Sequence, residues 1–352
     1  GSGAVVYDLL TDVNLAGTTK VDDLVVGGEI STTSAGTSNT RVGVNAGNSI
    51  ASGGNYNVVV GDEAGTAITT GDENTFVGYA TGDAVTTASA NTGVGYNALS
   101  QNTSGTQNSA FGNRAGDAIT TGDGNTAIGY FSLSSTTTAD NNTAVGVDSL
   151  GINSTGADNT GIGKDALRAN TTASNNTAVG SSALVANTTG SSNVAVGSAA
   201  GDAITTGNTN VAIGTNAMTT NTVGDRNVAV GHAALALYIP SSNEDSYNVA
   251  VGYNALYTDT TGKNNTAVGG NALLLNTTGN SNAAFGTGAL DANTTGGSNA
   301  SVGKSSLSAN TTGSANAALG ADALASNTTA SNNTAVGTNS LNANTTGSEN
   351  VA

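Results

Sequence analysis

One glycine recurs at a nearly constant spacing through most of the chain, and this period limits the possible folds more than any other feature. The glycine closes the pattern Asn-x-x-(Val/Ile/Phe/Leu)-Gly. It stands at Gly43, Gly61, Gly78, Gly95, Gly112, Gly129, Gly146, Gly163, Gly180, Gly197, Gly214, Gly231, Gly252, Gly269, Gly286, Gly303, Gly320 and Gly337. Fifteen of the 17 intervals are 17 residues long, one is 18 and one is 21. Such a period indicates stacked structural units rather than one globular core.

The repeated unit predicts a short strand followed by turns. It reads Asn-Thr-Ala-Val-Gly-x-x-Ala-Leu-x-x-Asn-Thr-Thr-Gly-x-x, as in residues 176–192. The residue before the glycine is almost always β-branched or aromatic, which suits a short buried strand. The sequence therefore predicts an all-β fold, a parallel β-solenoid or β-roll of 17-residue coils. We expect this shaft to span residues 36–352 with about 18 repeats.

Two apolar positions of the unit are the candidate core. The residue before the glycine is expected to point inward, and a leucine four residues after the glycine is expected to join it. The core set is Val94, Phe111, Ile128, Val145, Val179, Leu99, Leu167 and Leu184. A coil with so few large apolar side chains buries little surface alone. Chains packed side by side are therefore expected.

A coupled exchange between repeats supports a shared interior. Most units carry Leu or Met four residues after the glycine and usually Asn at seven, whereas five carry Gly at four and Ile or Val at seven. The five pairs are Gly47 with Ile50, Gly65 with Ile68, Gly82 with Val85, Gly116 with Ile119, and Gly201 with Ile204. The apolar group moves without being lost, as expected if one core volume is filled from either position.

The invariant glycine and asparagine are expected to be structural. The glycine suits a positive φ or a close approach of backbone, and stacked asparagines can form amide ladders along an axis. The representative turn and ladder residues are Gly95, Gly112, Gly129, Gly146, Asn91, Asn108, Asn125 and Asn142.

Composition narrows the possible functions. The net charge of −16 opposes binding to nucleic acid or to anionic membranes, and the absence of Cys removes thiol chemistry and Cys-ligated metals. No apolar run is long enough for a membrane span, so no membrane insertion is expected. His232 is the one histidine and stands where other units carry variable residues. No combination of nucleophile, base or paired carboxylates suggests an active site. We expect neither an enzyme nor a cofactor.

The acidic turns raise the question of a calcium site. Thr-Gly-Asp turns could offer oxygen ligands to Ca²⁺, although solvated turn carboxylates are the simpler interpretation and no established calcium motif is present. The acidic residues concerned are Asp62, Asp72, Asp83, Asp117, Asp123 and Asp202. No metal site is predicted.

Two segments depart from the period. Residues 1–35 are interpreted either as an N-terminal cap or docking segment or as degenerate first coils. A four-residue insertion near residues 235–247 contains the only proline and several aromatic residues. Insertions in repeat arrays form loops on one face, so this loop is either a contact point or an inert excursion. The candidate binding residues are Tyr238, Tyr247, Tyr253, Tyr257 and His232.

Tyrosines that directly follow the repeat glycine form a further candidate surface. They stand where most other units carry polar residues, so their rings are expected to face outward. They could stack on sugars or simply pack along the surface. The four are Tyr79, Tyr96, Tyr130 and Tyr253.

The repeat resembles those of bacteriophage tail-fibre shafts, and its Asn-x-Ala-Val-Gly segment is similar to repeats of trimeric autotransporter adhesin heads. The resemblance covers residues 39–352. It implies a homotrimeric fibre, in a virion tail or on a cell surface, that holds host-recognition parts away from the particle. The implied partners are further copies of the chain, virion proteins at the N-terminus, and a host glycan or protein receptor. Adhesin-head repeats are usually shorter than 17 residues. A bacterial surface adhesin is the alternative, and an ice-binding solenoid is the third possibility because Asn-Thr-Thr recurs in register.

Overall fold

The computed structural model describes residues 35–352 apart from residue 243, and within this range the chain is all-β. The segment proposed as an N-terminal cap therefore lies almost entirely outside the described residues. The strands, each three residues long, are β1 Thr40–Val42, β2 Val58–Val60, β3 Thr75–Val77, β4 Thr92–Val94, β5 Ser109–Phe111, β6 Thr126–Ile128, β7 Thr143–Val145, β8 Thr160–Ile162, β9 Thr177–Val179, β10 Val194–Val196, β11 Val211–Ile213, β12 Val228–Val230, β13 Val249–Val251, β14 Thr266–Val268, β15 Ala283–Phe285, β16 Ala300–Val302, β17 Ala317–Leu319 and β18 Thr334–Val336.

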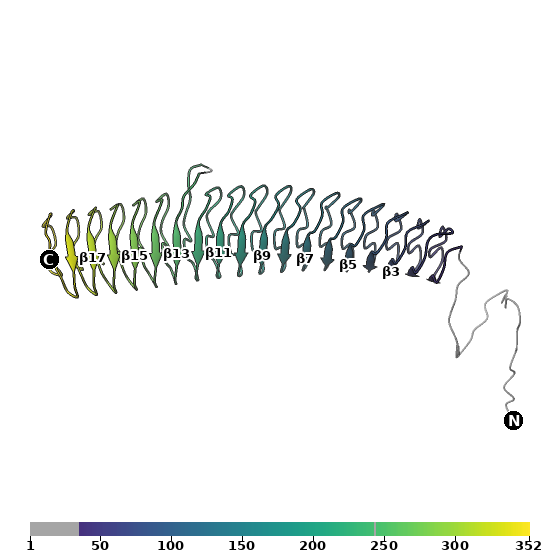
Figure 1. Ribbon diagram of the computed structural model, residues 1–352, viewed down its shortest axis with the longest axis horizontal. Helices are drawn as coiled ribbons and strands as arrows, with labels where there is room; N and C mark the ends of the chain where they lie inside the picture. The colour runs from purple at the N-terminus through teal and green to yellow at the C-terminus, as the bar shows by residue number, and fades with distance from the viewer. Residues whose placement is uncertain (1–34, 243) are drawn as a thin grey trace, which may run out of the picture.

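Consecutive strands form one parallel sheet that runs the length of a gently curved rod (Figure 1). Each strand pairs with the equivalent residues one repeat later, so that Val94 lies beside Phe111 and Phe111 beside Ile128. The predicted parallel β-solenoid is confirmed. At a strand spacing of about 4.8 Å, the stack is roughly 85 Å long.

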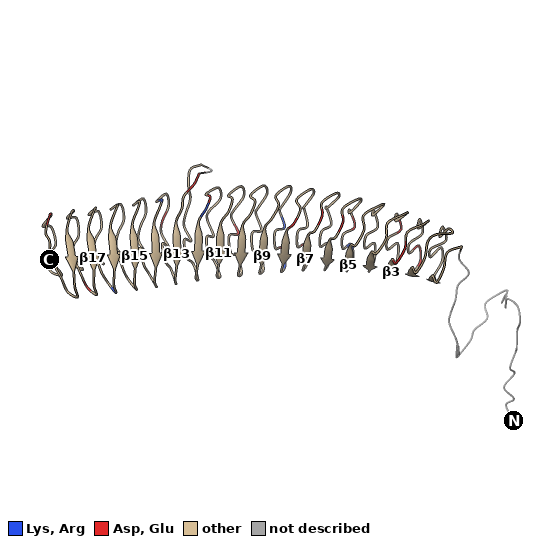
Figure 2. Ribbon diagram, in the orientation of Figure 1, with Lys and Arg blue, Asp and Glu red and all other residues tan. Residues whose placement is uncertain are grey.

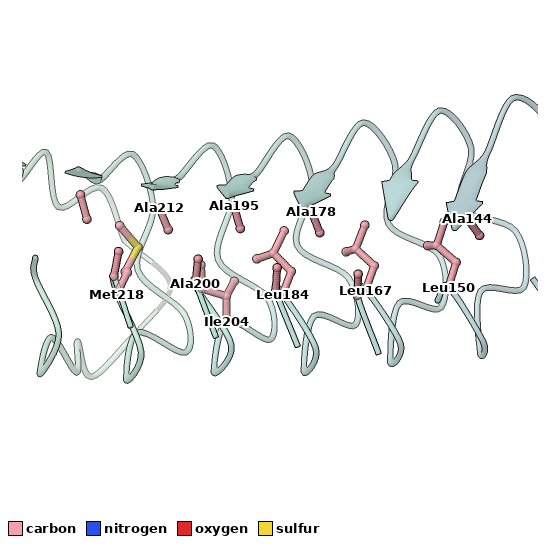
Figure 3. Packing of buried hydrophobic residues seen from close by; sticks show 14 of the residues in the cluster. Ala144, Leu150, Leu167, Ala178, Leu184, Ala195, Ala200, Ile204, Ala212 and Met218 are labelled. Carbon is pink, nitrogen blue, oxygen red and sulfur yellow. The ribbon is translucent and has the colours of Figure 1, made fainter. Parts of the chain in front are cut away.

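The interior is narrow and is filled mainly by small residues. The middle residue of each strand points inward and is usually alanine, as at Ala178 and Ala195. The leucine four residues after the glycine fills the remaining space, and Leu99, Leu167 and Leu184 are completely buried as predicted. Figure 3 shows Leu167 and Leu184, with Ala178 and Ala195, stacked from coil to coil inside the solenoid.

The residue before the repeat glycine lies outside the coil, so its predicted inward orientation is wrong for the single chain. Phe111 and Ile128 are 41% and 40% exposed. Val94, Val145 and Val179 are partly exposed. Side chains alternate along a strand, and the inward position of a three-residue strand is its centre. Both ends of the strand therefore face away from the core.

The coupled exchange of leucine and isoleucine has a backbone cause as well as a packing cause. The fourth residue after the glycine adopts a left-handed conformation, with φ of 50° at Leu184 and 58° at Gly201. Glycine adopts this conformation without strain. In the units with glycine, the isoleucine fills the space: a Cβ on Gly201 would lie 3.1 Å from Cδ1 of Ile204. Ile204 is 1% exposed, so the core volume is conserved as predicted.

Buried asparagines form the predicted ladder along the rod. The backbone N–H of Asn91 donates to Oδ1 of Asn74 at 3.0 Å, and its Nδ2 donates to the same oxygen at 3.2 Å and to the carbonyl of Gly105 at 2.9 Å. Asn91, Asn108, Asn125 and Asn142 are all buried. Each amide therefore bonds to the coil before it and the coil after it, which replaces the water it loses on burial.

The repeat glycine meets both conditions expected of it. Its φ is 140° at Gly95, 144° at Gly112, 134° at Gly129 and 136° at Gly146. In Gly180, with φ of 140°, an added Cβ would also lie 2.6 Å from the carbonyl carbon of Gly197 in the next coil. Other residues are therefore disfavoured here both by conformation and by contact.

Candidate binding surfaces

The outer face of the sheet carries an uncharged apolar column. Strands β2 to β18 contain no charged residue, and apart from Arg41 in β1 the charged residues of the described chain lie in the connecting segments (Figure 2). The third residue of each strand forms a continuous outward column along the rod, which we call the strand stripe. Its members are Val42, Val60, Val77, Val94, Phe111, Ile128, Val145, Ile162, Val179, Val196, Ile213, Val230, Val251, Val268, Phe285, Val302, Leu319 and Val336.

The stripe is unusual for an exposed surface. Ten of these side chains are at least 37% exposed, among them Phe285 at 42% and Leu319 at 52%. Apolar side chains scattered singly over a surface are normal, whereas a contiguous column of them marks an interaction surface. A chain with a net charge of −16 that keeps one long face free of charge offers that face for contact.

The five residues predicted to bind a partner do not converge. Tyr238 is completely buried. Tyr247 and Tyr253 lie at opposite ends of β13, the first before the strand and the second after it. His232, Tyr253 and Tyr257 line one pocket. The structure therefore separates the predicted set into an interior residue, a loop residue and a pocket.

Tyr238 occupies a position that other coils fill with buried asparagine. The seventh residue after the glycine forms a second amide column, in which Nδ2 of Asn170 donates to Oδ1 of Asn153 at 2.8 Å. Tyr238 and Asp259 interrupt that column in consecutive coils. Burial raises the pKa of Tyr238 to about 12 and that of Asp259 to about 7. Tyr238 is a core residue of the coil, and its burial counts against direct contact with a partner.

The carboxyl group of Asp259 is only partly accommodated in the amide column. Its Oδ1 accepts from the backbone N–H of Gly262 at 2.8 Å and from Nδ2 of Asn276 at 3.3 Å. Its Oδ2 has no hydrogen-bond partner among the described residues. An ionised carboxylate is costly in such surroundings, which is the physical cause of the raised pKa.

The insertion protrudes as one loop between β12 and β13 (Figure 1). It is shorter than the predicted 235–247, because Leu235 and Leu237 keep regular coil positions and donate to the carbonyls of Ala255 and Tyr257 at 2.9 and 3.0 Å. The excursion begins after Ile239, whose N–H still donates to the carbonyl of Thr260.

Ion pairs attach the base of this loop to neighbouring coils. Asp245 pairs with Arg226, and Nζ of Lys263 lies 2.7 Å from Oε2 of Glu244. The hydrogen bond from Lys263 lowers the pKa of Glu244. The hydroxyl group of Tyr247 donates to Oδ2 of Asp245 at 3.0 Å. Tyr247 is therefore already engaged in holding the loop.

His232 and Tyr253 form a stacked aromatic pair on two adjacent coils. Their rings are stacked with centroids 5.5 Å apart and planes 18° apart. The pair borders a pocket of about 500 Å³, which is also lined by Asp202, Asn216 and Tyr257. The remaining lining residues are Thr219, Ala233, Ala236, Leu237 and Asn254. The aromatic residues were identified from the sequence, but the acid and amides were not, because they come from three different coils.

The other tyrosines that follow the glycine also face outward, as predicted. Tyr79 and Tyr96 stack with centroids 5.4 Å apart, and Tyr130 packs edge-on against Phe131 at 4.4 Å. Tyr79, Tyr96, Tyr130 and Tyr253 are between 46% and 58% exposed. An outward aromatic pair is thus a repeated feature of this corner of the coil.

The acidic turn residues are spread along the rod. Asp123 accepts from the backbone N–H of Thr106 at 2.6 Å, and Asp72 accepts from that of Asn55 at 2.7 Å. Partial burial raises the pKa of Asp83, Asp117 and Asp202. Within the described part of the chain, no three acidic or histidine side chains gather as a metal-binding group would.

The described residues also include no helix long and apolar enough to cross a membrane. Comparison with known proteins identifies no relative: no protein family, no curated protein and no solved structure matches the chain significantly.

Proposed function

We propose that this chain is a structural shaft that holds other parts of a surface appendage at a distance. The observation that carries the proposal is the unbroken stacking of coils in one register. Backbone bonds, amide ladders and a continuous interior all run along the same axis. A solenoid of this kind is quasi-one-dimensional, so adding repeats increases its length without changing its cross-section.

The favoured setting is a bacteriophage tail fibre or a similar virion appendage. The support is the resemblance of the 17-residue repeat to tail-fibre shafts. A bacterial surface adhesin head is the alternative, because the same coils would serve equally well on a cell. The proposed location is accordingly a virion or an external cell surface.

The proposed assembly is a homotrimer whose chains meet through the strand stripe. Each stripe is apolar, uncharged and as long as the rod. Copies aligned in parallel would cover one another's stripes from end to end and keep the charged corners in water. This arrangement supplies the apolar burial that the narrow interior, filled mainly by alanine, does not.

The Asn-Thr-Thr array gives less support to an ice-binding role. Asn187 is buried, and the hydroxyl of Thr188 donates to the carbonyl of Thr205 at 3.0 Å. The hydroxyl of Thr171 bonds in the same way to the carbonyl of Thr188. Two of the three repeated polar groups are thus used within the rod.

Shortening the rod in its natural setting tests the proposal. Deleting residues 108–175 removes four whole coils and should shorten the rod by about 19 Å while preserving the register. Immunogold labelling of the particle or cell that encodes the gene should find both lengths on its surface. The proposal fails if the full-length protein is found only inside the cell, or if X-ray scattering shows it to be compact.

A further inference from the structure

We propose that the pocket beside His232 and Tyr253 binds a neutral sugar ring of a surface polysaccharide. The inference rests on the proposed function in one respect only, namely that the rod is displayed where such polysaccharides occur. The site itself is argued from the pocket's shape, its chemistry and its charge.

The aromatic rings at the pocket favour a ligand with an apolar face. The rings of His232 and Tyr253 are stacked on each other, so only the outer face of each ring remains for a ligand. Tyr253 is 58% exposed. The face of an aromatic ring carries partial negative charge and attracts the weakly positive C–H groups on one face of a pyranose. The volume of about 500 Å³ lies within the range of small-ligand sites, about 300–1,000 Å³.

Polar groups around the aromatic pair match sugar hydroxyls. Asp202 supplies carboxylate acceptors, Asn216 and Asn254 supply amide donors and acceptors, and Thr219 supplies a hydroxyl. A sugar needs both donors and acceptors around its edge, and this lining provides both. Asp202 and the three other polar residues come from three coils within a run of four, so the stacking of the rod is what assembles them.

Charge excludes an anionic ligand. The lining contains one carboxylate, from Asp202, and neither lysine nor arginine. The whole chain carries a net charge of −16. Phosphate, sulfate and acidic sugars would therefore be repelled at this site, so the sugar proposed here is a neutral one.

Tyr253→Thr and His232→Thr are suitable test variants because threonine occupies the equivalent position at Thr215 and Thr287, so the coil accepts it. Tyr96→Thr is the matched control, since Tyr96 belongs to another stacked aromatic pair, with Tyr79, at the same corner of the coil. Circular dichroism and melting temperature verify that all variants remain folded.

Saturation-transfer NMR and calorimetry with a panel of neutral glucose-, galactose- and mannose-based oligosaccharides test the proposal. We expect at least one oligosaccharide to bind the full chain, with affinity falling tenfold or more in Tyr253→Thr and His232→Thr but not in Tyr96→Thr. Three results would overturn it: no sugar of the panel binds, Tyr96→Thr loses as much affinity, or choline binds in place of the sugars. If the rod is displayed on a surface but its pocket binds no sugar, this inference is refuted and the proposed shaft function is not.

Discussion

Positive φ angles recur at the same residues of every coil, and they explain which substitutions the repeat accepts. The second residue after the glycine adopts φ of 58° at Ser182, 52° at Ala199 and 51° at Ala233. Alanine thus already stands in this left-handed position. The repeat glycine differs, because its φ is near 140° and the backbone of the next coil lies against it.

Replacing Gly180 by valine should therefore lower stability strongly, by about 3 kcal/mol or more, since strain and backbone overlap add together. Ser182→Ala should change the free energy of unfolding by less than about 0.5 kcal/mol. Thermal and urea unfolding of the two variants measure the difference. Equal effects would contradict the role assigned to the glycine.

Asp259 should make stability depend on pH. Its pKa is raised from 3.8 in the unfolded chain to about 7 in the folded rod. The folded state therefore holds the proton more tightly, and the stability this proton confers is complete below about pH 4 and is lost as the pH rises through 7.

Asp259→Asn restores the residue that equivalent coils carry, so it should raise stability at pH 8 by roughly 2–4 kcal/mol and have little effect at pH 4. Urea unfolding of both proteins at the two pH values isolates this group from the other buried carboxyls. A stabilisation that is the same at both pH values would contradict the prediction.

At the scale of one coil, the structural unit is the 17-residue repeat itself. Deleting residues 176–192 joins Asn175 to Asn193, which is the residue that equivalent coils have at that point. The shortened rod should keep its β circular dichroism and its melting temperature within a few degrees. Deleting only residues 176–184 should destabilise it, because the residues left at the junction are too few to complete a coil and to bring the next strand into register with β8. Comparable melting temperatures for the two deletions would argue against register as the organising principle.

The coil also shows why the sequence predicted some features and not others. Three features were predictable, because each repeats and each has a single physical explanation. They are the period, the amide ladder and the replacement of a core leucine such as Leu184 by a core isoleucine such as Ile204. The outward orientation of the strand stripe was not predictable. Larger apolar residues are usually the buried ones, but in these strands alanine faces the core and valine faces outward. Composition alone could not indicate whether the central residue or the two end residues of a three-residue strand face the core.

At the scale of the whole molecule, the strand stripe is the surface that should govern association. Phe111→Lys together with Ile128→Lys places two charges on adjacent strands of the stripe. These charges would be buried in the proposed trimer but solvated on a single chain. The double variant should therefore sediment as a monomer while retaining β circular dichroism.

Ser104→Lys with Thr121→Lys is the matched control, because these exposed residues lie at a corner away from the strands and add the same charge. Its sedimentation should equal that of the unmodified chain. A monomeric unmodified chain, or a double stripe variant that still forms trimers, would exclude the stripe as the interface.

The hydrogen bonds between strands lie along the rod, and this direction determines how the rod responds to force. A pull on its two ends loads the outermost coil first, because each coil is held only by its neighbours. When a coil unfolds, its 17 residues can extend to about 58 Å. In the folded stack the same residues span only about 4.8 Å along the rod. A single chain under tension should thus lengthen in steps of about 50 Å, one coil at a time, and so dissipate a sudden load without breaking its attachment.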